Sequence, residues 1–99
     1  MNDLLPQRDG DGYLKDIRQW TPQIGLAMAQ ADGFPIDQQM WDQVMFVRSY
    51  YQKTDKVPSI RQFIKAIKAD KKELFRMWKN GPLKPITKYG GMPKPTGCV

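Results

Sequence analysis

The chain contains no histidine and only one cysteine, Cys98. Histidine is the commonest general base and metal ligand, so its absence excludes a Ser–His–Asp triad, a Cys–His nucleophile pair and zinc sites built from Cys and His. A lone cysteine excludes an internal disulfide. No stretch approaches the roughly 20 apolar residues of a membrane span, and the first six residues lack the basic and then apolar layout of a secretory signal. We therefore expect a cytoplasmic protein with no membrane contact, no metal and no cofactor.

Length and composition are those of one globular domain: 99 residues, 40% apolar and 26% charged. The net charge of +6 is unevenly placed. Residues 1–52 hold four basic and seven acidic side chains, whereas residues 53–99 hold twelve basic and three acidic ones. Such a basic half fits a surface that faces an acidic partner, an anion or a nucleic acid, and equally a solvated face that keeps the protein soluble.

Helix-capping residues followed by apolar residues at helical spacing predict four helices. Their predicted N-caps or first residues are Thr21, Asp37, Ser59 and Asp70. The first is expected to end near Gly33 and the second at about Gln52. Before them, residues 9–12 read Asp-Gly-Asp-Gly, a strong turn signal, and a short hairpin or extended segment is expected there. The predicted fold class is mainly α.

The composition changes at Gly81. Residues 81–99 hold four prolines and four glycines, half of the sixteen in the chain. We expect little regular structure there beyond one short turn around residues 86–89, and hence an arm stiffened by prolines and hinged at Gly90–Gly91. The predicted organisation is a single domain over residues 1–99, with a core of about 9–80 and a C-terminal arm over 81–99.

Cys98 lies second from the end of this arm, where a side chain cannot readily join a core. A thiol exposed without purpose is an oxidation liability, so we interpret Cys98 as a nucleophile that visits partner active sites. Lys84, Lys88 and Lys94 favour the thiolate, and the terminal carboxylate of Val99 opposes it. Which of these charges dominates stays open.

Residues at both ends of the chain match a known pattern. The tail reads Gly91-Met92-Pro93-Lys94-Pro95-Thr96-Gly97-Cys98-Val99. Further matches, in order, are Asp11-Gly12-Tyr13-Leu14, Trp20, Trp41, Phe46-Val47-Arg48, Tyr50-Tyr51, Pro58, Arg61, Lys65 and Gly81-Pro82. Over residues 9–99 the chain closely resembles the DsrC/TusE family of sulfur carriers. The resemblance implies a compact, mainly α-helical domain with a small N-terminal β element and a flexible C-terminal arm.

The resemblance also implies a function for Cys98, which would accept sulfane sulfur as a persulfide and pass it on. The TusE branch relays sulfur from a TusBCD-type complex to a tRNA thiouridylase that makes 2-thiouridine, so tRNA is a partner only indirectly. The DsrC branch works with dissimilatory sulfite reductase and needs a second arm cysteine, eleven residues before the last. That position is Thr87 here. A hydroxyl cannot form the disulfide, which favours single-cysteine transfer of the TusE kind.

Five basic residues are candidates to supply charge for docking or for stabilising the anionic persulfide. They are Arg48, Arg61, Lys65, Lys84 and Lys94. The chain departs from the family pattern at Met40, where a histidine is usual, and in the run from Trp78 to Pro82. The segment between Lys65 and Leu74 is also shortened. These departures leave open which partner the helical body recognises.

Three alternatives remain beside the TusE-like relay. One is a DsrC-like partner or regulator of dissimilatory sulfite reductase or sulfur oxidation. Another is an adaptor that binds a sulfur-metabolism enzyme without carrying sulfur. The last is a helix-turn-helix regulator that binds nucleic acid through residues 38–68. Against it, the third predicted helix spends much of its surface on apolar residues: Ile60, Phe63, Ile64 and Ile67.

Overall fold

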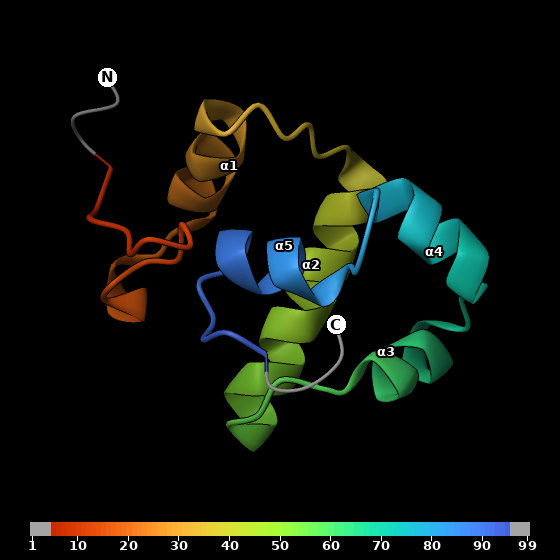
Figure 1. Cartoon of the computed structure of the whole chain (residues 1–99). Helices are drawn as coiled ribbons and strands as arrows, with labels where there is room; N and C mark the ends of the chain where they lie inside the picture. Colours follow the sequence, from red (N-terminus) through yellow and green to blue (C-terminus); the bar gives the residue numbers. More distant parts are fainter. Residues whose placement is uncertain (1–4, 96–99) are drawn as a thin grey trace.

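The computed structural model describes residues 5–95, and within them the regular secondary structure is almost entirely helical (Figure 1). A short 3₁₀ turn, η2, and five α-helices follow one another along the chain. Their bounds are η2 Ile17–Gln19, α1 Pro22–Ala31, α2 Gln38–Thr54, α3 Ile60–Ile67, α4 Lys71–Trp78 and α5 Leu83–Tyr89. The predicted mainly α fold class is confirmed. No helix in this described part of the chain is long and apolar enough to cross a membrane.

The first three predicted helix starts are confirmed by their capping hydrogen bonds. The Thr21 side chain accepts from the third residue of α1, with Pro22 in the first turn. Asp37 caps α2 in the same way. Ser59 and Gln62 form a reciprocal capping box at α3. Each bond satisfies a backbone N–H that has no partner inside its helix. Asp70 also stands at the N-cap position of α4, but its side chain makes no capping bond.

The predicted hairpin near the N-terminus is reduced to a tight turn closed by one antiparallel bridge, between Arg8 and Leu14. One carboxylate oxygen of Asp9 accepts from the backbone N–H groups of Asp11 and Tyr13 at 2.9 and 3.0 Å. These side-chain bonds give the backbone an alternative to a strand ladder, which is a common property of aspartate in turns.

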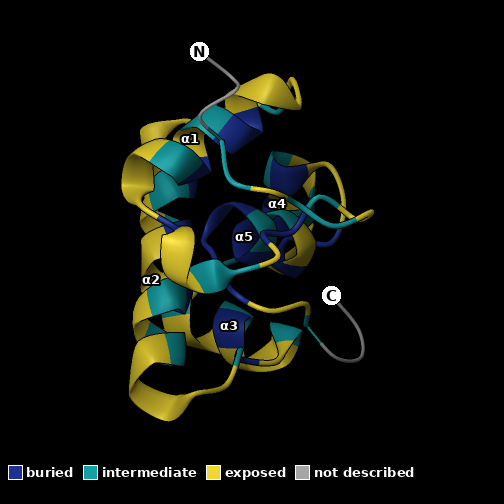
Figure 2. Cartoon of the chain, turned by 90° about the vertical axis from the view of Figure 1, so that its left-hand side faces the viewer, coloured by how far each residue is buried: buried dark blue, intermediate teal, exposed yellow. Residues whose placement is uncertain are grey.

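The prediction of little regular structure beyond Gly81 is wrong for residues 83–89, which form α5. This helix lies at the centre of the molecule and packs against α1 and α2 (Figure 1). Figure 2 shows most of α5 in the colour of buried residues. Proline is tolerated here because Pro82 and Pro85 lie at the start of the helix, where no intrahelical N–H bond is required.

Two groups of buried apolar side chains meet at α5. The larger joins α2, α3, α4 and α5 and contains Met40, Val44, Val47, Phe63, Leu74, Trp78, Leu83, Ile86 and Met92. The smaller joins the N-terminal turn, α1 and the end of α5 and contains Leu14, Trp20, Met28, Ala29 and Tyr89. Since Met92 is only 1% exposed, the core extends to residue 92, twelve residues beyond the predicted boundary at about residue 80.

Candidate functional site: the base of the C-terminal arm

Cys98, the predicted nucleophile, lies outside the described residues. The described chain leads toward it through residues 90–95. The site is therefore built from the groups that hold these residues. We call Trp20, Arg48, Gly90 and Gly91 the arm base.

The arm base holds three consecutive carbonyl groups at the end of α5. The indole N–H of Trp20 donates to the carbonyl oxygen of Tyr89 at 2.8 Å. The guanidinium of Arg48 donates to the carbonyl oxygens of Gly90 at 2.6 Å and Gly91 at 3.3 Å. It also lies over the Trp20 ring, 3.9 Å from the ring centroid. The last carbonyls of a helix have no partner within it, and here two side chains from distant parts of the sequence supply one.

The two glycines are packed so closely that the predicted hinge at Gly90–Gly91 is wrong. Both are buried. A Cβ on Gly91 would lie 2.4 Å from Cγ of Trp20, and its φ of +66° is one that other residues rarely adopt. A Cβ on Gly90 would lie 2.7 Å from the carbonyl oxygen of Ile86. Beyond them the Met92 N–H donates to the carbonyl oxygen of Thr87 at 3.0 Å. These residues act as a fixed end of the core.

Lys94 is, along the sequence, the predicted site residue nearest to Cys98 among the described ones. Its ammonium forms ion pairs with Asp11 and, at 3.6 Å, with Asp9, and it lies 5.8 Å from the ring centroid of Tyr13. The hydrogen bond to Asp11 raises the pKa of Lys94 above its ordinary value. The positive charge of Lys94 is thus matched by the N-terminal turn.

Thr87, at the position of the second family cysteine, is completely buried. Its hydroxyl bonds to the carbonyl oxygen of Leu83 at 2.7 Å and shares a 2.8 Å hydrogen bond with the Tyr13 hydroxyl. Tyr13 in turn reaches the carbonyl oxygen of Lys84 at 3.1 Å. Burial raises the pKa of Tyr13, which keeps its hydroxyl protonated. Position 87 therefore holds a structural hydrogen-bond network that links α5 to the N-terminal turn.

The structure separates the five candidate charged residues. Arg48 is partly buried in the arm base, and burial lowers its pKa from the usual value. Arg61 and Lys65 are exposed on α3, and Lys84 is exposed on α5. Within the described chain these three share no hydrogen bond or ion pair with Arg48 or Lys94.

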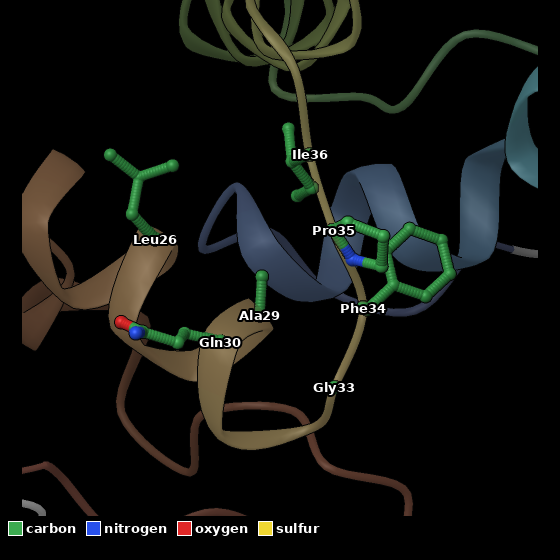
Figure 3. A pocket seen from close by; sticks show the side chains of 7 residues that line it. All are labelled: Leu26, Ala29, Gln30, Gly33, Phe34, Pro35 and Ile36. Atoms are coloured by element: carbon green, nitrogen blue, oxygen red, sulfur yellow. The ribbon is translucent and has the colours of Figure 1, made fainter.

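Two hollows border residues 92–95, and Pro93 and Lys94 line both of them. One, of about 360 Å³, is lined by residues 55–59 together with Tyr51 and Gln62. The other, of about 530 Å³, is lined by residues 13–18 together with Asp9. A third hollow, of about 480 Å³, lies between α1 and the segment 33–36 and is drawn in Figure 3. No residue of the arm base or of the segment 92–95 lines it.

The fold and the arm base define a class of protein: a small helical domain that anchors a short C-terminal segment, with its only cysteine beyond that anchor. The family described as DsrC like protein matches residues 1–99. The chain belongs to this DsrC-like family.

Individual relatives agree with the family. The chain is 35% identical over 98 residues to "Sulfurtransferase TusE" of Salmonella typhimurium, covering 92% of this chain and 90% of that protein. It is similar in structure to DsrC of Allochromatium vinosum, with a TM-score of 0.81 and 33% identity, over 93% of this chain and 88% of the other. The oxidized DsrC γ-subunit of dissimilatory sulfite reductase from Archaeoglobus fulgidus gives a TM-score of 0.78 and 27% identity, over 95% and 92%. These likenesses support a sulfur-relay carrier of the TusE kind.

The sequence interpretation missed two partners of the arm. Trp20 appeared only as a family match, and Asp11 only as a turn residue and a family match. The pair Gly90–Gly91, which is followed by Pro93 and Pro95, was a sign of close packing as well as of flexibility. The pairing of Arg48 with Gly90 spans 42 residues of sequence, and no local pattern indicates it.

Proposed function

We propose that this protein is a sulfurtransferase of the carrier type, which takes up sulfane sulfur as a persulfide on Cys98 and hands it to a partner protein. The destination is a TusE-like relay toward 2-thiouridine in tRNA. The observation that carries the proposal is the tail: the only thiol of the chain stands in a family-specific sequence that begins where the arm base ends.

The proposed chemistry needs no oxidant, reductant or cofactor. The Cys98 thiolate attacks the terminal sulfur of a donor persulfide, a new S–S bond forms, the old one breaks, and the donor leaves as a thiolate. An acceptor thiolate then attacks the outer sulfur of the Cys98 persulfide and releases the Cys98 thiolate. Since the thiolate is the reacting form, acidity at Cys98 and activation by the partner set the rate.

Partner proteins in this proposal are a donor complex of the TusBCD type and a tRNA thiouridylase, in the cytoplasm. The exposed Arg61 and Lys65 on α3 and Lys84 on α5 are the proposed docking charges, because solvent-exposed cations steer association with acidic surfaces. Arg48 and Lys94 are less suited to docking, since the chain's own groups already engage them.

A DsrC-like role beside dissimilatory sulfite reductase is the second candidate, and the likeness to the A. fulgidus γ-subunit favours it. Against it stands Thr87, which cannot form a disulfide with Cys98. A purely regulatory form of the DsrC-like role responds to Cys98→Ser differently from a sulfur carrier. A regulator that works without carrying sulfur keeps its effect on the reductase in this variant, whereas a carrier loses all transfer.

Intact-mass spectrometry tests the proposal. The full chain is incubated with a cysteine desulfurase and cysteine as persulfide source. We expect a gain of one sulfur atom on the wild type, reversed by a reducing thiol, and no gain on Cys98→Ser. An unchanged mass in the wild type, or an equal gain in the variant, would rule out Cys98 as the carrier.

A further inference from the structure

We propose that Arg48 is a positioning residue for Cys98: by holding the carbonyls of Gly90 and Gly91 against Trp20, it sets where and in which direction the arm leaves the core. The inference rests on the proposed function only in taking Cys98 as the residue to be delivered. It assigns to Arg48 a task that differs from the docking or persulfide-stabilising charge expected from sequence.

The geometry of Arg48 fits this task. The residue is partly buried on α2, the longest of the described helices, which packs against α5. One guanidinium nitrogen donates to two successive carbonyl oxygens while the plane of the group lies over the Trp20 ring. Arginine, unlike lysine, combines a planar set of donors with a face that stacks on an aromatic ring. Three parts of the chain, carrying Trp20, Arg48 and Gly90–Gly91, are thereby locked together.

The contacts of Arg48 lie close to the last fully buried residue before the arm, so they limit how far the Cys98 thiol can move. Met92 is the last residue of the chain with a fully buried side chain among those described, and Cys98 follows six residues later. An extended chain spans about 3.3–3.6 Å per residue, so Cys98 reaches at most about 22 Å from Met92. If the arm base opened back to Tyr89, nine residues would span at most about 32 Å.

Shortening and directing the arm raises the concentration of the thiol near a docked partner. For a flexible tether, the local concentration of the thiol falls roughly as the −3/2 power of tether length, or more steeply if it follows the volume that the tether can reach. A tether of nine residues in place of six therefore lowers the local concentration about two- to threefold. Loss of a fixed exit direction adds to this. Arg48 thus affects delivery of Cys98 without touching the sulfur.

A spin label on Cys98 tests the proposal directly, because the chain has a single thiol and takes one label. The label broadens backbone amide signals in the NMR spectrum of nearby residues. In the wild type we expect broadening concentrated on residues lining the two hollows beside the arm: Asp9 and 13–18 in one, and Tyr51, 55–59 and Gln62 in the other. In Arg48→Met we expect it to spread to further faces, with faster local motion at Gly90 and Gly91. Arg48→Lys, which keeps a charge and a single donor nitrogen but no planar group, should fall between the two.

Arg76→Met is the matched control, an exposed arginine on α4 paired only with Glu73 in the described chain, and its broadening pattern should equal that of the wild type. An unchanged pattern in folded Arg48→Met would overturn the proposal. If Arg48→Met fails to fold, Trp20→Phe serves instead: it keeps a ring beside Arg48 and removes the bond to Tyr89, and a pattern identical to wild type would again contradict the proposed lock.

A merely structural role for Arg48 would lower the melting temperature and leave the pattern, measured well below melting, unchanged. A reaction with cyanide distinguishes an effect of Arg48 on delivery of the thiol from an effect on its chemistry. It removes the outer sulfur of a persulfide as thiocyanate and leaves the Cys98 thiolate, so its rate reports on the chemistry without a docked partner. We expect equal rates in wild type and Arg48→Met. Failure to load sulfur at all would refute the proposed function, whereas the label experiment needs no sulfur and tests Arg48 alone.

Discussion

At the scale of single residues, two glycines of the described chain differ in how closely they are packed. Gly25 on α1 faces the end of α5, where an added Cβ would lie 2.3 Å from the carbonyl oxygen of Tyr89 and 2.7 Å from the indole nitrogen of Trp20. Gly10, in the N-terminal turn, has no atom within 4 Å of such a Cβ. Gly25 lets α1 approach the arm base closely, whereas Gly10 lies in a turn with open space around it.

Gly25→Ala is therefore expected to be severely destabilising, by about 2–4 kcal/mol, because the neighbour that must move is backbone held by its own hydrogen bond. Gly10→Ala is the matched control and should change the free energy of unfolding by less than about 0.5 kcal/mol. Urea unfolding of both variants, followed by tryptophan fluorescence, measures the difference. Equal stabilities would contradict the close approach of α1 to the arm base.

The buried hydroxyl of Thr87 supplies a second prediction at this scale. Thr87→Val keeps the shape and removes the hydrogen bond with Tyr13, which retains its bond to the carbonyl oxygen of Lys84. Because one partner remains, we expect a loss of only about 1 kcal/mol in the free energy of unfolding. Thr87→Ser keeps the hydroxyl and serves as the control for the lost interaction. A Thr87→Val variant as stable as wild type would show that the network adds nothing.

At the scale of elements, α2, α3 and α4 all end on residues other than glycine in the left-handed conformation. Asp55, Lys68 and Lys79 have φ of 61°, 54° and 64°. A side chain costs about 1–2 kcal/mol there, which glycine avoids. The helices are thus stopped by strained residues, and each stop is a place where the protein can be stabilised.

Lys79→Gly at the end of α4 should raise the free energy of unfolding by about 0.5–1 kcal/mol, the strain relieved less the extra entropy of the unfolded glycine. Lys72→Gly, the same substitution inside α4, should lower it by about 1 kcal/mol. A higher stability of Lys79→Gly and a lower stability of Lys72→Gly in thermal unfolding would support the observed end of α4. A loss of stability in both variants would place Lys79 inside the helix instead.

The same scale shows why α5 escaped prediction while α1 to α4 did not. Caps at Thr21, Asp37 and Ser59 are local signals, readable from neighbouring residues. The signals around α5 are prolines and glycines, which usually mark loops. Here Pro82 and Pro85 lie at the start of the helix, Gly90 packs against Ile86, and Gly91 packs against Trp20. Only tertiary packing distinguishes these cases, and the contacts that decide it come from residues 42 and 69 positions away.

At the scale of the whole molecule, a polar link ties the N-terminus to α1 and α5. Arg8 forms two 3.0 Å hydrogen bonds with Asp32, and the Tyr89 hydroxyl donates to the same carboxylate at 2.8 Å. The hydrogen bond from Arg8 is the main cause that lowers the pKa of Asp32 below its usual 3.8. Burial, followed by the bond to Asp32, raises the pKa of Tyr89. These hydrogen bonds thus hold the N-terminal turn, the end of α1 and the end of α5 together beside the arm base.

This link predicts a loss of stability in acid. Since the folded Asp32 binds its proton less readily than the unfolded one, its contribution is fully present well above the ordinary carboxyl pKa of 3.8. The contribution is lost as the pH falls through that value and below it. Urea unfolding at neutral pH and at about pH 3 should show a smaller pH dependence in Asp32→Asn than in the wild type. An equal dependence in both would contradict the role of the link.

The position of Cys98 in the chain could be read from sequence, since a lone thiol in a family-specific tail needs no tertiary information. The arm base could not, because Trp20, Arg48 and Gly91 are brought together only by folding.

The measurement that tests the central claim most directly is the amount of thiocyanate released by cyanide from the protein after loading with sulfur and removal of the donor. We expect one thiocyanate per chain from the wild type and none from Cys98→Ser. Equal amounts from the two proteins, or none from either, would contradict a sulfur carrier that works through this one thiol.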